Sequence, residues 1–325
     1  MPESPTSATS ASLTVGGKDV VAYKYKLDSG IYSLSWISIA TPISLSSLSE
    51  GSHTVSVIGK DSAGNWQAEG SATMVTWTVD LTPSTATISG TPAALTNATS
   101  VSLTVSGTDV VAYKYKLDGG VYSASEIPAG TPITLSSLSE GSHTVSVIGK
   151  DTAGNWQAEG SATTVTWTVD INPPTGTISI NNGALRTRST SVILNITATD
   201  TTSGVVKMSL SSDGVVYGEW EHFSPTRSWI LSLAPGEKRV YVKFKDAAGN
   251  ESVPYSGMIT LDATEKGDID GSGGVVDLKD VILALQVMSR ITPAVPIYKE
   301  ADVNGDGRIG LPEAIYILQK VGEIR

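Results

Sequence analysis

The sequence contains no cysteine and only three histidines. The lack of cysteine excludes a disulfide framework and any zinc or iron–sulfur site with thiolate ligands, and three histidines leave few nitrogen ligands for other metals. Basic residues are also few, because 22 lysines and arginines stand against 32 aspartates and glutamates and give a net charge of −10. No general positive field is present, so we expect no nucleic-acid partner.

Long hydrophobic runs are absent as well. No stretch approaches 18 consecutive apolar residues, and the opening residues, MPESPTSATSAS, lack the basic and apolar regions of a signal peptide. We therefore expect no membrane insertion. The length of 325 residues, at roughly 100 to 200 residues per domain, predicts two to four domains.

The chain carries a tandem duplication. Ala11–Asp80 overlays Val101–Asp170 at an offset of 90 residues, with 57 of 70 positions identical. A weaker third copy follows, in which KFKDAAGNES at Lys243–Ser252 matches the IGKDSAGNW and IGKDTAGNW stretches of the first two copies. About the first 260 residues are therefore expected to form three related domains.

Each copy has the alternating pattern of half-buried β-strands. In VAYKYKL, residues 21–27, every second residue beginning at Val21 is apolar or aromatic, and Trp77 and Trp167 alternate with threonines in the same way. We place these two tryptophans in the core. The motif Asp-x-Ala-Gly-Asn and the Asp-Gly pairs supply turns between the strands. Several short strands per copy predict antiparallel β-sandwiches.

This arrangement resembles the immunoglobulin-like and fibronectin type III-like repeats common in large bacterial surface proteins, in which the D-x-AGN motif lies between the last two strands. The resemblance covers roughly residues 1–262 and implies fold more than function. The expected repeats are 1–82, 83–172 and a divergent 173–263. The first copy has no counterpart of the strand-like TATIS at residues 85–89, so we expect the chain to begin inside a repeat of a longer protein. Proline-bearing junctions predict an extended rod.

The last sixty residues contain two acidic, glycine-rich loops. The second loop, which begins at Asp302, has oxygen-bearing side chains at positions 1, 3 and 5, Gly307 at position 6 and Glu313 at position 12. Calcium requires six to eight oxygen ligands, which this alternation supplies, and Arg308 can contribute only its carbonyl. Pro312 suits the start of the helix that follows. The pattern predicts a calcium loop.

The first loop, which begins at Asp268, is one residue longer. With one extra glycine allowed at Gly273 or Gly274, Asp280 reaches position 12 and closes the sphere. Because an aspartate is shorter than a glutamate, we expect this site to be the more perturbed of the two. The alternative is that both loops are ordinary Asp-Gly turns at the starts of two helices. The predicted ligands for two Ca²⁺ ions are Asp268, Asp270, Ser272, Asp277, Asp280, Asp302, Asn304, Asp306, Arg308 and Glu313.

Each loop leads into one apolar helix, expected at residues 280–288 and 313–321, with equivalent residues at an offset of 33. The paired loop-helix units, residues 264–325, resemble a type I dockerin. That resemblance implies a small all-α, EF-hand-like calcium module that docks onto a cohesin domain of another protein. In that family, loop positions 10 and 11 contribute to partner choice, commonly as Ser-Thr. The corresponding residues are Leu278, Lys279, Leu311 and Pro312, which argues against the known cellulosomal cohesins as partners.

A catalytic function is not expected from these residues. Glu219 to His222 form the most reactive-looking cluster, but alternation places Glu219 and Glu221 on a solvated face, with Trp220 and His222 on a half-buried one. Carbohydrate binding would need exposed aromatic platforms, for which Trp66 and Trp156 are the candidates. We expect a mostly β, non-catalytic, extracellular or surface-attached segment. The alternatives are the accessory region of a secreted glycoside hydrolase or protease, and an adhesin that binds a polysaccharide or a protein.

Overall fold

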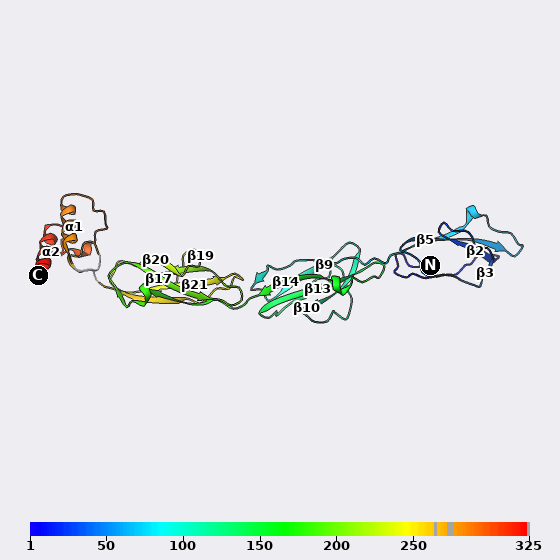
Figure 1. The fold of residues 1–325 in the computed structure, drawn as a ribbon, viewed down its shortest axis with the longest axis horizontal. Coiled ribbons are helices and arrows are strands. Elements are labelled where there is room, and N and C mark those ends of the chain that lie inside the picture. The colour runs from blue at the N-terminus through cyan, green and yellow to red at the C-terminus, as the bar shows by residue number, and fades with distance from the viewer. Residues whose placement is uncertain (263–264, 272–275, 324–325) are drawn as a thin grey trace. The chain divides into compact units, whose positions relative to one another are not determined.

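The computed structural model describes residues 1–262, 265–271 and 276–323. Its first 262 residues form β-sheets, and two α-helices lie near the C-terminus (Figure 1). The sheets divide into three sets that follow the three sequence copies. Each set contains one smaller and one larger sheet, which is the arrangement of a β-sandwich.

The first sandwich has sheets β1-β4 and β3-β2-β5-β6. Its elements are β1 (Ala11–Leu13), β2 (Val20–Leu27), β3 (Ile37–Ser38), β4 (Ile43–Leu45), β5 (Gly51–Asp61), the 3-10 turn η1 (Glu69–Ser71) and β6 (Thr73–Val79). The smaller sheet has two strands, whereas the smaller sheet of each later copy has three. A cavity of about 260 Å³, lined partly by Leu13, Ile43 and Val55, lies in this sandwich.

The second sandwich has the smaller sheet β12-β9-β7, and its larger sheet contains the order β11-β10-β13-β14. Its elements are β7 (Thr87–Ser89), β8 (Leu95–Thr96), β9 (Val101–Ser106), β10 (Val110–Leu117), β11 (Ile127–Pro128), β12 (Ile133–Leu135), β13 (Gly141–Asp151), η2 (Glu159–Ser161) and β14 (Thr163–Val169). Trp167 is only 2% exposed, and its counterpart Trp77 in the first sandwich is 1% exposed. Both tryptophans therefore lie in the cores, as predicted.

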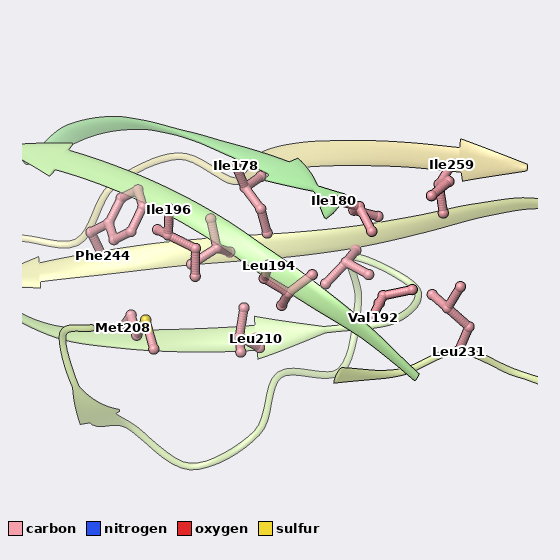
Figure 2. Close-up of a cluster of buried hydrophobic side chains, with 12 residues drawn as sticks. Ile178, Ile180, Val192, Leu194, Ile196, Met208, Leu210, Leu231, Phe244 and Ile259 are labelled. Atoms are coloured by element: carbon pink, nitrogen blue, oxygen red, sulfur yellow. The ribbon is translucent and has the colours of Figure 1, made fainter. Parts of the chain in front are cut away.

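The third sandwich has sheets β15-β17-β20 and β16-β22-β21-β18-β19. Its elements are β15 (Thr175–Ile180), η3 (Asn181–Gly183), β16 (Arg186–Thr187), β17 (Ser191–Thr199), β18 (Val205–Ser211), β19 (Glu221–His222), β20 (Thr226–Ile230), β21 (Gly236–Asp246) and β22 (Tyr255–Leu261). Figure 2 shows its core, in which Ile178, Leu194 and Phe244 come from different strands and meet between the sheets. Ile259 holds the register position that Trp77 and Trp167 hold in the other two copies, and Phe223 and Trp229 pack against this core from partly buried positions.

The strand order is shared by the three copies. One 11-residue strand lies inside the larger sheet of each copy. It is β5 between β2 and β6, β13 between β10 and β14, and β21 between β18 and β22. The smaller sheet consists of β7, β9 and β12 in the second copy and of β15, β17 and β20 in the third. This is the order of immunoglobulin-like and fibronectin type III-like sandwiches. The chain is therefore mostly β, with tandem domains of this type.

The simple alternation fails at the start of one strand in every copy. Val21 is 46% exposed and Val111 is 44% exposed, although the period of two places both in the core. The reason is a β-bulge: the pairing register shifts between Val20 and Ala22, and again at the equivalent place in the other two copies. A bulge adds one unpaired residue and reverses the faces on its N-terminal side, so Val110 is buried in place of Val111.

The D-x-AGN motif forms the loop between the last two strands, as predicted. In the second sandwich, Asp151 accepts a hydrogen bond from the Asn155 backbone at 2.8 Å, and the Asn155 side chain donates to the backbone carbonyl of Asp80 at 2.8 Å. The third sandwich repeats this geometry, with Asn250 donating to the carbonyl of Asp170 at 2.8 Å. In the second and third sandwiches, the asparagine thus binds the residue that directly follows β6 or β14.

Candidate metal centre in the C-terminal helical module

The C-terminal module consists of the helices α1 (Leu278–Met288) and α2 (Leu311–Glu323), with the 3-10 turn η4 (Lys299–Ala301) before the second loop (Figure 1). Both helices begin two residues before the predicted starts. In α1 the earlier start has a clear cause, because Asp277 and Asp280 form a reciprocal capping box. The two helices share one core, whose buried members are Ile269, Val276, Val281, Leu283, Ala284, Ala301, Ile309, Ala314 and Ile317.

The second loop folds around the carboxylate of Asp302. Its two oxygens accept hydrogen bonds from the backbone of Gly305 at 2.8 Å and of Gly307 at 2.6 Å. Gly307 has φ = +77°, the left-handed conformation that the motif predicts for its sixth position. Burial raises the pKa of Asp302, but backbone N–H groups, led by that of Gly307, outweigh it and hold the pKa below its usual value. The loop therefore favours an ionised carboxylate at position 1.

Glu313 closes the second loop from the first turn of α2. Its side chain is 1% exposed, and it accepts hydrogen bonds from the backbone of Val303 at 3.1 Å and of Gly310 at 2.6 Å. Asp306 and Asn304 bond to each other, with Asn304 Nδ2 3.0 Å from Asp306 Oδ2. Arg308 is exposed and donates its backbone N–H to Asp306.

The first loop repeats the closing contacts of the second. Asp280, 1% exposed, accepts from the backbone of Ile269 at 2.8 Å and of Asp277 at 2.9 Å. These donors occupy loop positions 2 and 9, the positions that Val303 and Gly310 occupy around Glu313. The shared pattern places one buried carboxylate at the N-terminus of each helix, where the helix dipole favours a negative charge. Ser272, the predicted ligand at position 5, and the candidate extra glycines lie outside the described residues.

Three carboxylates of the first loop converge. One carboxylate oxygen from each of Asp268, Asp270 and Asp280 lies within 4.8 Å of the other two. Asp277 does not join them, because its exposed side chain caps α1 by accepting from the Lys279 backbone at 2.7 Å. Oxygen-only clusters of this kind suit a hard cation such as Ca²⁺.

The second loop does not gather its acidic residues as closely. Across residues 1–262, 265–271 and 276–323, two groups of three acidic side chains meet within 4.8 Å, one in the first loop and one in the third sandwich. The first loop brings together the larger set of carboxylates, and the expectation that it is the more perturbed of the two stays a prediction. In the second loop, position 3 is the neutral Asn304, and Asp306 binds the Asn304 amide. The assignment of both loops to calcium stays a prediction.

The four predicted partner residues lie at the starts of the two helices, and all four are exposed. Leu278 is 56% exposed and Leu311 is 53% exposed. Each begins an apolar stripe of one helix face at spacings of four and three residues. The stripe of α1 contains Leu278, Ile282 and Leu285, and that of α2 contains Leu311, Ile315 and Leu318, all of them at least 46% exposed.

The residues weighed for catalysis have structural contacts. Glu221 is half-buried and forms an ion pair with Arg227 at 3.0 Å. His222 is exposed, which differs from the half-buried position that alternation predicts, because β19 is only two residues long. His53 is 7% exposed and bridges Asp28 at 2.9 Å and the Ser49 carbonyl at 2.8 Å, so it fastens a loop to β5.

The candidate aromatic platforms are covered in part by lysines. Trp66 is 38% exposed, and the ammonium groups of Lys24 and Lys60 lie 5.5 Å and 5.9 Å from its ring centroid. Trp156 has the same arrangement in the second sandwich. These cation–π contacts occupy the ring faces that a sugar would stack on. Within the part of the chain that the structure describes, no helix is long and apolar enough to span a membrane.

No protein-family model matches the chain, and no curated protein matches it. Several solved structures are similar. The fibronectin(III)-like modules of Clostridium thermocellum CbhA share 15% identity, with 55% of this chain and 94% of that chain covered and a TM-score of 0.35. A Ca²⁺-stabilized adhesin with which an Antarctic bacterium binds ice shares 18% identity, with 80% and 71% covered and a TM-score of 0.32. A tetra-tandem repeat from the extending region of a large adhesion protein shares 20% identity, with 79% and 71% covered and a TM-score of 0.26. The strand order itself gives tandem β-sandwiches of the immunoglobulin-like and fibronectin type III-like kind.

Proposed function

We propose that this chain is a non-catalytic, extracellular modular segment in which the β-sandwiches act as spacers and the C-terminal module docks, in a calcium-dependent way, onto a cohesin-type domain of another protein. The observation that carries the proposal is the pair of exposed apolar stripes on α1 and α2, which begin at Leu278 and Leu311. Two equivalent apolar faces beside two equivalent acidic loops favour a dockerin-like module over ordinary helix-capping turns.

Calcium would act on these faces through the loops. The carboxylates of Asp280 and Glu313 belong to the first turns of the helices and also accept backbone hydrogen bonds from the loops. A cation bound by each loop would therefore fix the start of the helix that bears the stripe. Because a metal site rarely exists in the unfolded chain, the free energy of binding would also stabilise the fold.

The sandwiches fit the role of spacers. Two of the three histidines, His53 and His143, are used in equivalent loop contacts of the first and second sandwiches. A side chain that serves the same structural contact in two copies is poorly suited to a single catalytic role.

A direct binding measurement tests the proposal. The full chain is immobilised, and purified cohesin-type domains encoded in the same genome are applied in calcium and in excess chelator. We expect at least one domain to bind in calcium only. Leu278→Asp together with Leu311→Asp should weaken that binding at least tenfold, since burying an exposed leucine contributes about 1.5–3 kcal/mol, or roughly 10- to 100-fold in affinity. Each single variant should retain most of the affinity, because the other stripe offers the same spacing.

The matched control is Leu185→Asp, a leucine of the third sandwich that is 84% exposed. This variant should bind as the unchanged chain does. Binding that persists in the double variant, or that falls equally in the control, would show that the stripes are not the docking surface. If every cohesin-type domain fails to bind a chain whose helices are folded in calcium, the docking proposal is wrong.

A further inference from the structure

A second group of acidic side chains lies in the third sandwich, outside the two predicted calcium loops. One carboxylate oxygen from each of Asp170, Asp200 and Asp246 lies within 4.8 Å of the other two. Asp170 is fully buried, Asp246 is 2% exposed and Asp200 is half-buried. Asp170 lies at the junction before the third sandwich, and the fold adds two aspartates from loops that are distant in the sequence.

Three separate connections supply these residues. Asp170 directly follows β14, Asp200 directly follows β17, and Asp246 is the last residue of β21. The alternation of strands brings the ends of β17 and β21 to the same end of the sandwich, where the chain enters it.

Hydrogen bonds from the backbone fix each carboxylate. Asp200 Oδ1 accepts from Ser203 and Gly204, each at 2.8 Å. Asp246 Oδ1 accepts from Gly249 at 2.7 Å, within the D-x-AGN loop. The three side chains are therefore held in place by the loops and not merely near one another.

One oxygen of the group is left without a partner. Asp170 Oδ1 accepts from the Asn172 backbone at 3.0 Å, but Asp170 Oδ2 is buried and has no hydrogen-bond partner. Among the described residues, no ion pair joins any of the three aspartates to a lysine, arginine or histidine. A buried, unpaired carboxylate oxygen beside two other carboxylates is unfavourable unless a cation supplies the missing charge.

We propose that Asp170, Asp200 and Asp246 bind a Ca²⁺ ion at the entry of the third sandwich. The ligands are hard oxygens drawn from loops, which suits the large and variable coordination sphere of calcium, and water or backbone carbonyls complete the sphere. The site goes beyond the docking function, because none of its residues belongs to the C-terminal module. Its effect is to fix the segment before β15 to the loops after β17 and β21.

The second sandwich provides an internal comparison. Asp80 and Asp151 stand where Asp170 and Asp246 stand, and the same asparagine contact joins them. The residue after β9 is Gly107, however, where β17 is followed by Asp200. Its loop carries Asp109 instead, an exposed residue that accepts a hydrogen bond from the Thr152 hydroxyl at 2.8 Å. The second sandwich thus keeps two of the three carboxylates and is not expected to bind calcium in the same way.

The test is a count of bound calcium by equilibrium dialysis and elemental analysis of the full chain in about 1 mM Ca²⁺. Asp200→Asn should lower the count by one Ca²⁺ per chain, while Asn retains the Oδ1 acceptor that the loop needs. Asp109→Asn, the matched control in the equivalent loop, should leave the count unchanged. An equal count for Asp200→Asn and the unchanged chain overturns the proposal.

A second comparison distinguishes calcium bound at this site from calcium bound at the C-terminal loops. In a chain carrying Asp280→Asn and Glu313→Gln, one Ca²⁺ should remain, and Asp200→Asn should remove it. If the C-terminal loops fail to bind calcium, the background and the unchanged chain give the same count, and the loss on Asp200→Asn still decides the third-sandwich site. Should Asp200→Asn lose its β-sheet circular dichroism, Asp170→Asn takes its place in the same comparison.

Discussion

Removal of calcium should unfold the two C-terminal helices and leave the sandwiches folded. In the first loop, Asp268, Asp270 and Asp280 place three carboxylate oxygens within 4.8 Å. At an effective dielectric constant of about 20, each ionised pair repels by roughly 3 kcal/mol or more, so three pairs approach 10 kcal/mol. A module of about 60 residues typically has only about 3–9 kcal/mol of total stability. Without a cation, the repulsion is therefore comparable to everything that holds the module together.

Two spectroscopic signals separate the parts of the chain. All seven tryptophans lie in residues 36–229, so tryptophan emission reports the sandwiches, whereas α1 and α2 dominate the helical band of the far-ultraviolet circular dichroism. On addition of excess chelator at 25 °C, we expect the helical band to disappear and the tryptophan emission to stay folded-like. Returning calcium should restore the helices.

A pair of neighbouring aspartates gives the matched variants. Asp280→Asn removes a carboxylate from the buried cluster and should raise the calcium concentration needed for half-folding by tenfold or more. Asp277→Asn changes an exposed cap, a role that asparagine fills equally well, and should shift that concentration little. Helices that persist unchanged in excess chelator would refute the electrostatic reasoning.

Three further predictions concern single contacts. The Ser49 carbonyl, followed by Asp28, raises the pKa of His53 above its ordinary value of about 6.5. The protonated histidine therefore stabilises the first sandwich fully below about pH 6.5, and this stabilisation is lost as the pH rises through the folded-state pKa. The urea midpoint of unfolding, followed by tryptophan emission, should fall over that pH range, and Asp28→Asn should reduce this dependence on pH. A steeper fall in the variant would contradict the role given to the His53 contact. Tyr113→Phe removes a 2.6 Å hydrogen bond to a backbone carbonyl and should lower the unfolding free energy by about 1–2 kcal/mol in urea titrations, whereas an unchanged value would mean that water replaces the hydroxyl. Gly271 has φ = +61°, and Gly271→Ala would put a methyl group into the ring of Tyr298. The thermal midpoint of the helical circular dichroism band should therefore drop. An unchanged midpoint would argue against the observed loop conformation.

The sandwiches could be predicted from the sequence because three independent patterns agree. The duplication, the period of two and the D-x-AGN turns all indicate the same strands, and the tryptophans they place inside are buried. The β-bulge between Val20 and Ala22 could not be predicted, since it depends on the pairing of β2 with β5. The sequence itself alternates through this stretch without a sign of the bulge. The exposure of Val21 follows from that tertiary pairing alone.

The acidic residues of the C-terminal loops could be found from their spacing, but their roles could not all be assigned. Asp277 fits a ligand position in the loop pattern, yet its side chain caps α1, because an aspartate three residues before another acidic residue also satisfies a capping box. The group formed by Asp170, Asp200 and Asp246 could not be predicted from the spacing of residues in the sequence. Asp200 lies 30 residues from Asp170 and 46 from Asp246, and only the topology of the third sandwich brings them together.

The asparagine of the D-x-AGN loop has a consequence for how such repeats can be copied or exchanged. Because Asn155 binds the carbonyl of Asp80, the second sandwich depends on a residue that precedes the proline junction at Pro83. A gene segment cut at residue 83 would separate the two, and the transplanted repeat would lose this hydrogen bond while the Asn155 amide kept its bond to Asp151. A transplantable second repeat should therefore begin no later than Asp80, three residues before the junction proline.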